Sequence, residues 1–226
     1  MKSIFYVAVL ITFFSCKENS TSQKETASGK EATTVGTSPE NPPKTPQEVR
    51  SADVLRSVDD IKTEYAYITS ILKSGRMDST SFEYDCRSEK SGRVVYFSEK
   101  GQLRMIKHTY HEYSHFSATD TYFVKDNALF FAFYKHVAWS FVNQNQTKDD
   151  VTEKRLYLIG NKSVKCLQKK YALLSDANAT DAPAPDTGAN KETDCSSLEP
   201  IVAGFELLFD RRNQKENLAC LTEKGH

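Results

Sequence analysis

The chain has 226 residues, and its 30 Lys and Arg are balanced by 30 Asp and Glu, so the formal net charge is zero. A protein that binds nucleic acid through the phosphates needs a basic excess, and we therefore expect no nucleic-acid partner. Aromatic residues make up 11% of the chain, a content that favours a β-rich core.

The first 16 residues have the proportions of a signal peptide. Lys2 supplies a positive charge, and the apolar run Ile4–Phe14 follows it. This run is shorter than the ~20 residues that a helix needs to span a bilayer. It ends at Ser15 and Cys16, so residues 1–16 are predicted to be a targeting segment.

The residues Phe13-Phe14-Ser15-Cys16 resemble the lipobox of bacterial lipoproteins. The resemblance implies that Cys16 carries the lipid anchor, palmitate included, and that the protein is an outer-membrane lipoprotein of the cell envelope. Lys17-Glu18 is similar to the surface-export signal of Bacteroidota lipoproteins, with Asn19 in place of its second acid. Display on the periplasmic side and display on the cell surface both remain open. The alternative is a plain secretory signal with a chance cysteine.

Residues 17–44 are rich in Ser, Thr, Lys, Glu and Pro and are predicted to form a disordered tether. A single domain is expected over 45–226. Thr45-Pro46-Gln47-Glu48 is typical of a helix start, and Gly75 is a fitting end. The apolar residues between them recur at helical spacing and predict one amphipathic helix that packs on its own sheet, or alternatively on a coiled-coil partner. They are Val54, Val58, Ile61, Tyr65, Ile68 and Leu72.

A unit that is typical of β-hairpins occurs three times. A Tyr followed by an aromatic or aliphatic residue leads through a turn to Leu or Val, as in Tyr96–Leu103, Tyr122–Leu129 and Tyr157–Val164. The turns contain Gly or Asn, which adopt positive φ at least cost. Gly and Asn come one or two places earlier in the third copy, which leaves the type of its turn open. The pattern Y-F-x-x-x-G-x-L resembles hairpin repeats of small exported bacterial proteins, which implies a sheet scaffold and no particular substrate.

Strands joined by short turns in this order predict an antiparallel meander of six to eight strands. Phe130–Tyr134 is apolar on both faces, so this strand is expected to be central and covered on both sides. The predicted strands are 81–87, 93–98, 102–113, 116–124, 128–141, 153–159 and 163–170, and residues 143–150 are expected to be a polar loop.

Leu174–Asp194 has low complexity and predicts a mobile loop. Ser196-Ser197-Leu198-Glu199 then resembles a capping box, and a second amphipathic stripe follows. The fold class is therefore α+β, an antiparallel meander with an N-terminal and a C-terminal amphipathic helix. The second stripe consists of Leu198, Ile201, Val202, Phe205, Leu208 and Phe209.

Four cysteines remain in the expected domain, and an even number in an exported chain predicts two disulfides. Their spacings match no zinc site. Cys166 is expected on the sheet face of Met105 and Phe131, so a Cys166–Cys195 bond would hold the second helix on the sheet. Cys86 and Cys220 would then pair by elimination. A Cys195–Cys220 bond and free buried thiols are the alternatives.

One histidine-rich segment could bind zinc or copper. It contains His108, His111, Glu112 and His115, and His136 lies in the next hairpin. On a strand His108 points away from the other two, and a turn near Ser114 would separate those as well. No HExxH helix is expected here. The histidines are interpreted as solvated strand residues, and no metal or other cofactor is predicted.

The chain carries no GxSxG elbow, Walker loop or GxGxxG motif. We expect a non-enzymatic lipoprotein held to the membrane by its N-terminal lipid, which binds an envelope protein, a glycan or a peptide through its sheet. The alternative is a metal-assisted hydrolase that uses His108, His111, His115 and Glu112.

Overall fold

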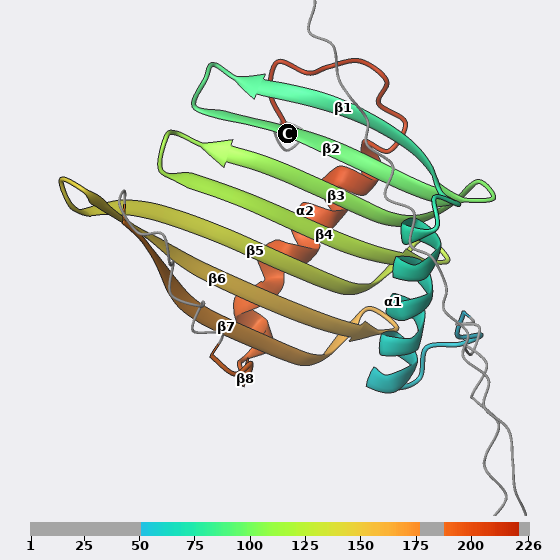
Figure 1. Ribbon diagram of the computed structural model, residues 1–226. Coiled ribbons are helices and arrows are strands. Elements are labelled where there is room, and N and C mark those ends of the chain that lie inside the picture. The colour runs from blue at the N-terminus through green and yellow to red at the C-terminus, as the bar shows by residue number, and fades with distance from the viewer. Residues whose placement is uncertain (1–50, 177–187, 222–226) are drawn as a thin grey trace, which may run out of the picture. The chain divides into compact units, whose positions relative to one another are not determined.

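The computed structural model describes residues 51–176 and 188–221. The expected signal peptide with Cys16, the tether 17–44, the helix start at Thr45 and residues 177–187 of the expected loop lie outside these residues. Within the described residues the strands form one antiparallel sheet in chain order (Figure 1). The strands are β1 (Asp78–Cys86), β2 (Lys90–Glu99), β3 (Gln102–Glu112), β4 (Phe116–Lys125), β5 (Ala128–Asn143), β6 (Gln146–Ile159), β7 (Lys162–Asp176) and β8 (Lys191–Glu192).

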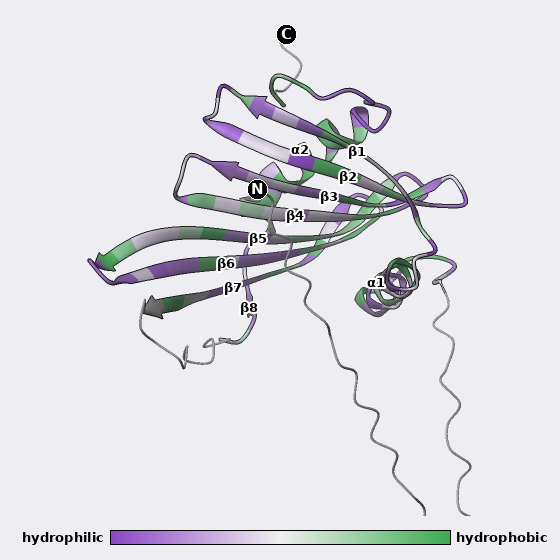
Figure 2. Cartoon of the chain, turned by 45° about the horizontal axis from the view of Figure 1, so that its top comes forward, coloured by the Kyte–Doolittle hydropathy of each residue, from purple (hydrophilic) through white to green (hydrophobic). Residues whose placement is uncertain are grey.

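Two α-helices pack on opposite sides of this sheet (Figure 2). Helix α1 (Val58–Lys73) precedes β1, and helix α2 (Glu199–Asp210) follows β8 after the short 3-10 helix η1 (Cys195–Leu198). The predicted α+β meander with an N-terminal and a C-terminal helix is therefore confirmed. The central position of β5 is confirmed as well. Phe131 is buried in the hydrophobic cluster that includes α1, and its neighbour Ala132 is buried in the cluster that includes α2, on the other face.

Helix α1 begins later than predicted. Residues 51–57 are not helical, and Val54 is 54% exposed rather than part of the apolar stripe. The cap is Ser57, whose Oγ accepts a hydrogen bond from the backbone N–H of Asp60. Gly75 lies just past the helix at φ 69°, as expected for a C-terminal glycine.

The first two hairpin repeats share one backbone design. Lys100-Gly101 and Asp126-Asn127 form two-residue turns in which every residue has positive φ, the geometry of a type I′ turn. One extra residue follows on the outgoing strand as a β-bulge, Arg104 in the first copy and Phe130 in the second. The predicted turns are thus confirmed.

The third copy keeps the same turn type, but its residues are shifted by one. Gly160-Asn161 has positive φ at both positions, and Val164 is the bulge residue. Tyr157 therefore corresponds to Phe123 and not to Tyr122. Val164 corresponds to Phe130, but Phe130 is buried whereas Val164 is 45% exposed. The sequence pattern aligned the tyrosines, whereas the backbone aligns the turns.

The predicted loop 143–150 was also wrong. Only Gln144 and Asn145 form a turn, and the rest extends β5 and β6. The polar composition reflects a hairpin end with solvent on both faces. Leu174–Asp176 of the expected mobile loop belong to β7, and Lys191–Glu192 form β8.

Helix α2 rests on buried tyrosines of the sheet. Tyr96 Oη donates to the carbonyl of Leu208 at 2.8 Å, and Tyr122 and Tyr134 hydrogen-bond each other beneath the helix. A Cβ at Gly204 would lie 2.7 Å from Tyr122 Oη, so glycine permits this close approach. The helical region starts at Asp194, which caps η1, and not at the predicted Ser196.

Both predicted disulfides are present. Cys166–Cys195 links β7 to η1, and Cys86–Cys220 ties the C-terminal segment to the end of β1. The reason given for the first pair was wrong, because Cys166 faces α2, whereas Met105 and Phe131 face α1. Two disulfides indicate an extracytoplasmic protein.

Helix α1 is fixed by a buried carboxylate. Glu64 is fully buried, and its Oε2 accepts hydrogen bonds from Ser51 Oγ at 2.7 Å and from the N–H of Ala52 at 2.9 Å. Its Oε1 lies 3.4 Å from Lys125 Nζ and 3.9 Å from Arg104 Nη1. The carboxylate of Glu64 therefore connects helix α1 to the segment before it and to strands β3 and β4.

We expect Glu64→Ala to lower the free energy of unfolding by about 3 kcal/mol, because removing one partner leaves buried cations without a counter-charge. Glu64→Gln keeps an acceptor for Ser51 and Ala52 and should cost less. Urea unfolding followed by circular dichroism measures both. Asp59→Ala, which breaks the exposed Asp59–Lys62 pair, is the control. Equal effects of Glu64→Ala and Asp59→Ala would contradict this role.

Candidate functional site

The two faces of the sheet are covered unequally. Helix α2 crosses one face, whereas α1 packs only over the residues beside the two-residue turns of the other. The remainder of the α1 side carries polar side chains in strands β2 to β5. We call this surface the open face, and it consists of Ser91, Arg93, Val95, Lys107, Thr109, His111, Ser117, Thr119, Thr121, Phe133, Lys135 and Val137.

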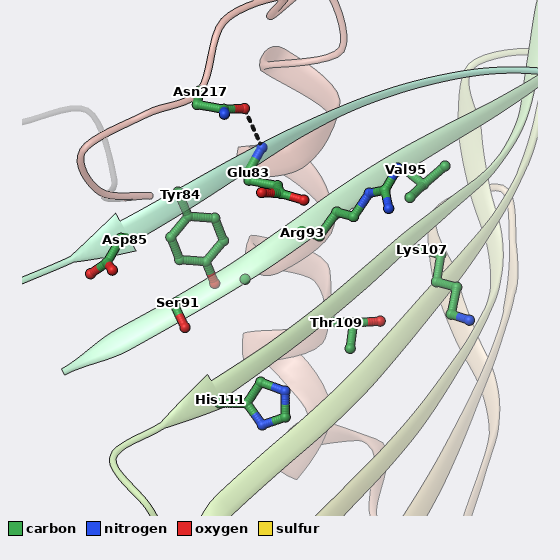
Figure 3. Close-up of a pocket in the computed structure, with 11 residues that line it drawn as sticks. Glu83, Tyr84, Asp85, Ser91, Arg93, Val95, Lys107, Thr109, His111 and Asn217 are labelled. Carbon is green, nitrogen blue, oxygen red and sulfur yellow. Dashed lines mark hydrogen bonds between the residues drawn. The ribbon is translucent and has the colours of Figure 1, made fainter. Parts of the chain in front are cut away.

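A depression of about 700 Å³ lies on the β1–β3 part of this face (Figure 3). Asn217 forms its outer wall, because its Oδ1 accepts a hydrogen bond from the N–H of Glu83 at 2.9 Å. Leu218 pairs with Tyr84, and the Cys86–Cys220 bond secures this segment against the edge of the sheet. The lining residues are Glu83, Tyr84, Asp85, Ser91, Gly92, Arg93, Val95, Lys107, Thr109, His111 and Asn217.

A second depression, of about 330 Å³, lies between α1 and strands β5 and β6. Its walls are largely aromatic, and Arg155 stacks over the Phe133 ring at 4.8 Å. The pairing Lys107–Thr121–Phe133–Arg155 runs across β3 to β6, so the two depressions adjoin on one face. The lining residues are Ile61, Lys62, Tyr65, Phe131, Phe133, Arg155 and Tyr157.

The opposite face buries a polar network next to α2. Tyr84 Oη and His108 Nε2 are hydrogen-bonded at 2.8 Å, and the His108 ring stacks on Tyr110 at 4.5 Å. Tyr84 reaches His108 across Gly92, where a Cβ would lie 2.7 Å from Tyr84 Oη. Burial, and secondarily the charge of Lys90, lowers the pKa of His108 to about 3.

A carboxylate–imidazole pair lies in the same network. Asp120 Oδ1 and His136 Nε2 are 2.8 Å apart, with Asp120 buried and the His136 side chain 28% exposed. Burial raises the pKa of Asp120, and its hydrogen bond with His136 acts in the opposite direction. Asp120 can thus orient the His136 ring at the rim of the buried network.

The predicted histidine cluster is dispersed. His108 is only 7% exposed and faces α2, so its interpretation as a solvated residue was wrong. His111 lines the large depression on the other face, and His115 lies in the β3–β4 turn against Trp139, with ring centroids 4.2 Å apart. Glu112 pairs with Lys90 at 2.6 Å. Residues 111–115 do spell H-E-x-x-H, but they leave a strand and enter a turn instead of forming a helix.

The described residues contain no group of three or more His, Cys, Asp or Glu that could hold a metal ion. All four cysteines of the described region are in disulfides. The sequence did not single out Arg93, Lys107, Thr109 and Lys135. Their alternation with apolar residues indicates a solvent-exposed face of the sheet. The sequence alone does not indicate which face of the sheet lacks a covering helix.

The fold and the site define an α+β domain in which each face of the meander sheet carries one helix, and the α1 side leaves most of strands β2 to β5 uncovered. Comparisons of the chain with models of protein families, with curated proteins and with solved structures find no match.

The lowered pKa of His108 predicts that stability falls with acidity. Unfolded His108 takes up a proton below about pH 6.5, whereas the folded residue stays neutral until about pH 3. Its contribution is therefore present above pH 6.5 and is lost as the pH falls. Between pH 7 and pH 5 the loss should be about 2 kcal/mol.

The measurement is urea unfolding of the wild type and of His108→Gln at both pH values. Asp120, whose raised pKa acts in the opposite sense, is present in both proteins and cancels in the comparison. An equal pH dependence in the two proteins would show that His108 is not the group responsible.

Proposed function

We propose that the protein is an exported lipoprotein of the cell envelope whose domain binds a ligand across the open face and performs no catalysis. The observation that carries the proposal is the open face itself, with two adjoining depressions beside α1. Volumes of about 700 and 330 Å³ lie in the range of ligand sites, roughly 300–1,000 Å³.

The chemistry of the open face supports binding instead of helix packing. Its central pairs are Thr109–Thr119 and His111–Ser117, flanked by exposed Arg93 and Lys135. A surface that packed against a further helix would be mainly apolar, and its polar groups would have partners, as they do beneath α2. An envelope protein, a glycan or a peptide could each contact such a polar face.

The proposed location outside the cytoplasm and the lipid anchor are supported by the described domain and by Cys16. The two disulfides support an extracytoplasmic location, and no described helix is both long and apolar enough to cross a membrane. A lipid on Cys16 would attach the domain to the outer membrane, with the domain in the periplasm or on the cell surface.

We expect Cys16→Ala to abolish membrane attachment and to leave the protein unprocessed or soluble in the envelope fraction. Detergent-phase partitioning and labelling with a palmitate analogue measure this directly. Ser22→Ala, which keeps the cysteine, should behave as the wild type. If Cys16→Ala still partitions into detergent, the anchor lies elsewhere.

If the ligand binds on the open face, large side chains introduced at the centre of that face should block binding. Thr109→Tyr with Thr119→Tyr should remove the glycans or proteins that the mature chain retains from an envelope extract, because the rings would fill the space above β3 and β4. Lys170→Tyr adds a ring to exposed β7 on the α2 side and should retain the same set. Identical retention by the two variants would contradict the proposed site.

A further inference from the structure

We propose that the open face contains an anion subsite centred on Thr109 and that its ligand is an acidic polysaccharide. The inference rests on the proposed function, since it names the ligand of the same face. It starts from the pattern of charges in the sheet register.

Thr109 is surrounded by basic side chains. Arg93 lies directly opposite it on β2, and Lys107 and His111 precede and follow it on the same face of β3. Across the β3–β4 pair, Thr119 separates it from Lys135 on β5. Diagonal neighbours in a sheet are about 7–8 Å apart, so Arg93 and Lys107 are close enough to share one carboxylate or sulfate group. Lys135, two strands from Thr109, offers a second contact point for an acidic chain.

Arg93, Lys107 and Lys135 form no ion pair within 4 Å in the described part of the chain. Glu153 lies directly opposite Lys135 on β6, but it pairs with Arg155 at 3.0 Å instead. Glu83 faces Arg93 across the β1–β2 pair, yet no ion pair within 4 Å joins them, and Arg93 Nη2 donates to Ser81 Oγ at 3.1 Å. Asp85 lies opposite Ser91, and Lys107 and Lys135 form no ion pair with any described residue. Exposed like charges repel one another, and a bound anion would relieve that repulsion.

The hydroxyl groups of the face are also available. Thr109, Thr119 and Thr121 make no side-chain hydrogen bond within the described residues. Hydroxyl groups both donate and accept, as sugar hydroxyls require. Phe133 and Tyr157 stand at the end of the same surface, next to Arg155, and offer flat rings for a sugar ring to stack on.

An extended peptide fits this surface less well. Peptides that bind sheets add a strand to a free edge and use main-chain hydrogen bonds. The backbone of β2 to β5 is already paired on both sides. A chain that binds here must use side chains alone and must cross about three strand spacings of 4.8 Å, roughly 14 Å, from Arg93 to Phe133. A polysaccharide with spaced acidic groups meets this requirement.

The test uses biotinylated polygalacturonate, neutral dextran and poly-glutamate as probes on the mature chain. The variant Lys107→Gln with Lys135→Gln should bind polygalacturonate about tenfold more weakly than the wild type, equivalent to ~1.4 kcal/mol. Lys154→Gln with Lys170→Gln removes the same charge from the α2 side and should bind as the wild type. Thr109→Val should also weaken binding, and circular dichroism confirms that each variant is folded.

Several results would overturn the inference. If both double-lysine variants lost the same affinity for polygalacturonate, the binding would depend on non-specific charge alone. If dextran bound as tightly as polygalacturonate, the face would contain no anion subsite. Poly-glutamate bound more tightly than polygalacturonate would assign the site to an acidic peptide. Failure to bind any of the probes would reject the polysaccharide, whereas the proposed function would fail only if the Thr109→Tyr, Thr119→Tyr variant also retained its ligands.

Discussion

The buried carboxylate of Glu64 decides how the two faces of this sheet differ. It is held between Lys125 and Arg104, and Arg104 is the residue that the first β-bulge adds to β3. A buried charge tolerates little displacement, because each shift leaves it unpaired in a poorly solvated place. Helix α1 is therefore fixed beside the turns, and the rest of its side of the sheet stays uncovered.

The opposite face shows how a helix is held on this sheet. Helix α2 lies on tyrosines whose hydroxyl groups satisfy helix carbonyls, and burial raises the pKa of Tyr122 and Tyr134. The neutral hydroxyls can thus remain under the helix with hydrogen-bond partners. The open face has the reverse character: among the residues that the structure describes, Thr109, Thr119 and Thr121 make no side-chain hydrogen bond, and Lys107 and Lys135 form no ion pair. One sheet thereby combines a rigid support with a surface suited to a polar ligand.

The hairpin repeat predicts some features of the sheet correctly and misses others. Positive-φ residues in the turns and the antiparallel order were predictable, because both depend on neighbouring residues. The bulge was not, and it shifts the alternation of side chains by one residue. The face predicted for Cys166 is wrong for another reason: the third turn lies one residue nearer to its tyrosine than the other two turns do. Its partner, Cys195, was predicted correctly. His108 was misjudged differently: it shares its face with Ile106 and Tyr110, and that alternation indicated burial.

Periodicity and cysteine count are local properties of the chain, and the α+β class, the strand order, the two helices and the number of disulfides follow from them. Contacts between distant segments set the face that each helix covers, the burial of Glu64, and the shared surface of Arg93, Lys107, Thr109 and Lys135. These residues come from three strands, β2, β3 and β5, and their proximity follows from the pairing register. Register depends on bulges and turns summed over the whole sheet, and no single segment contains that information.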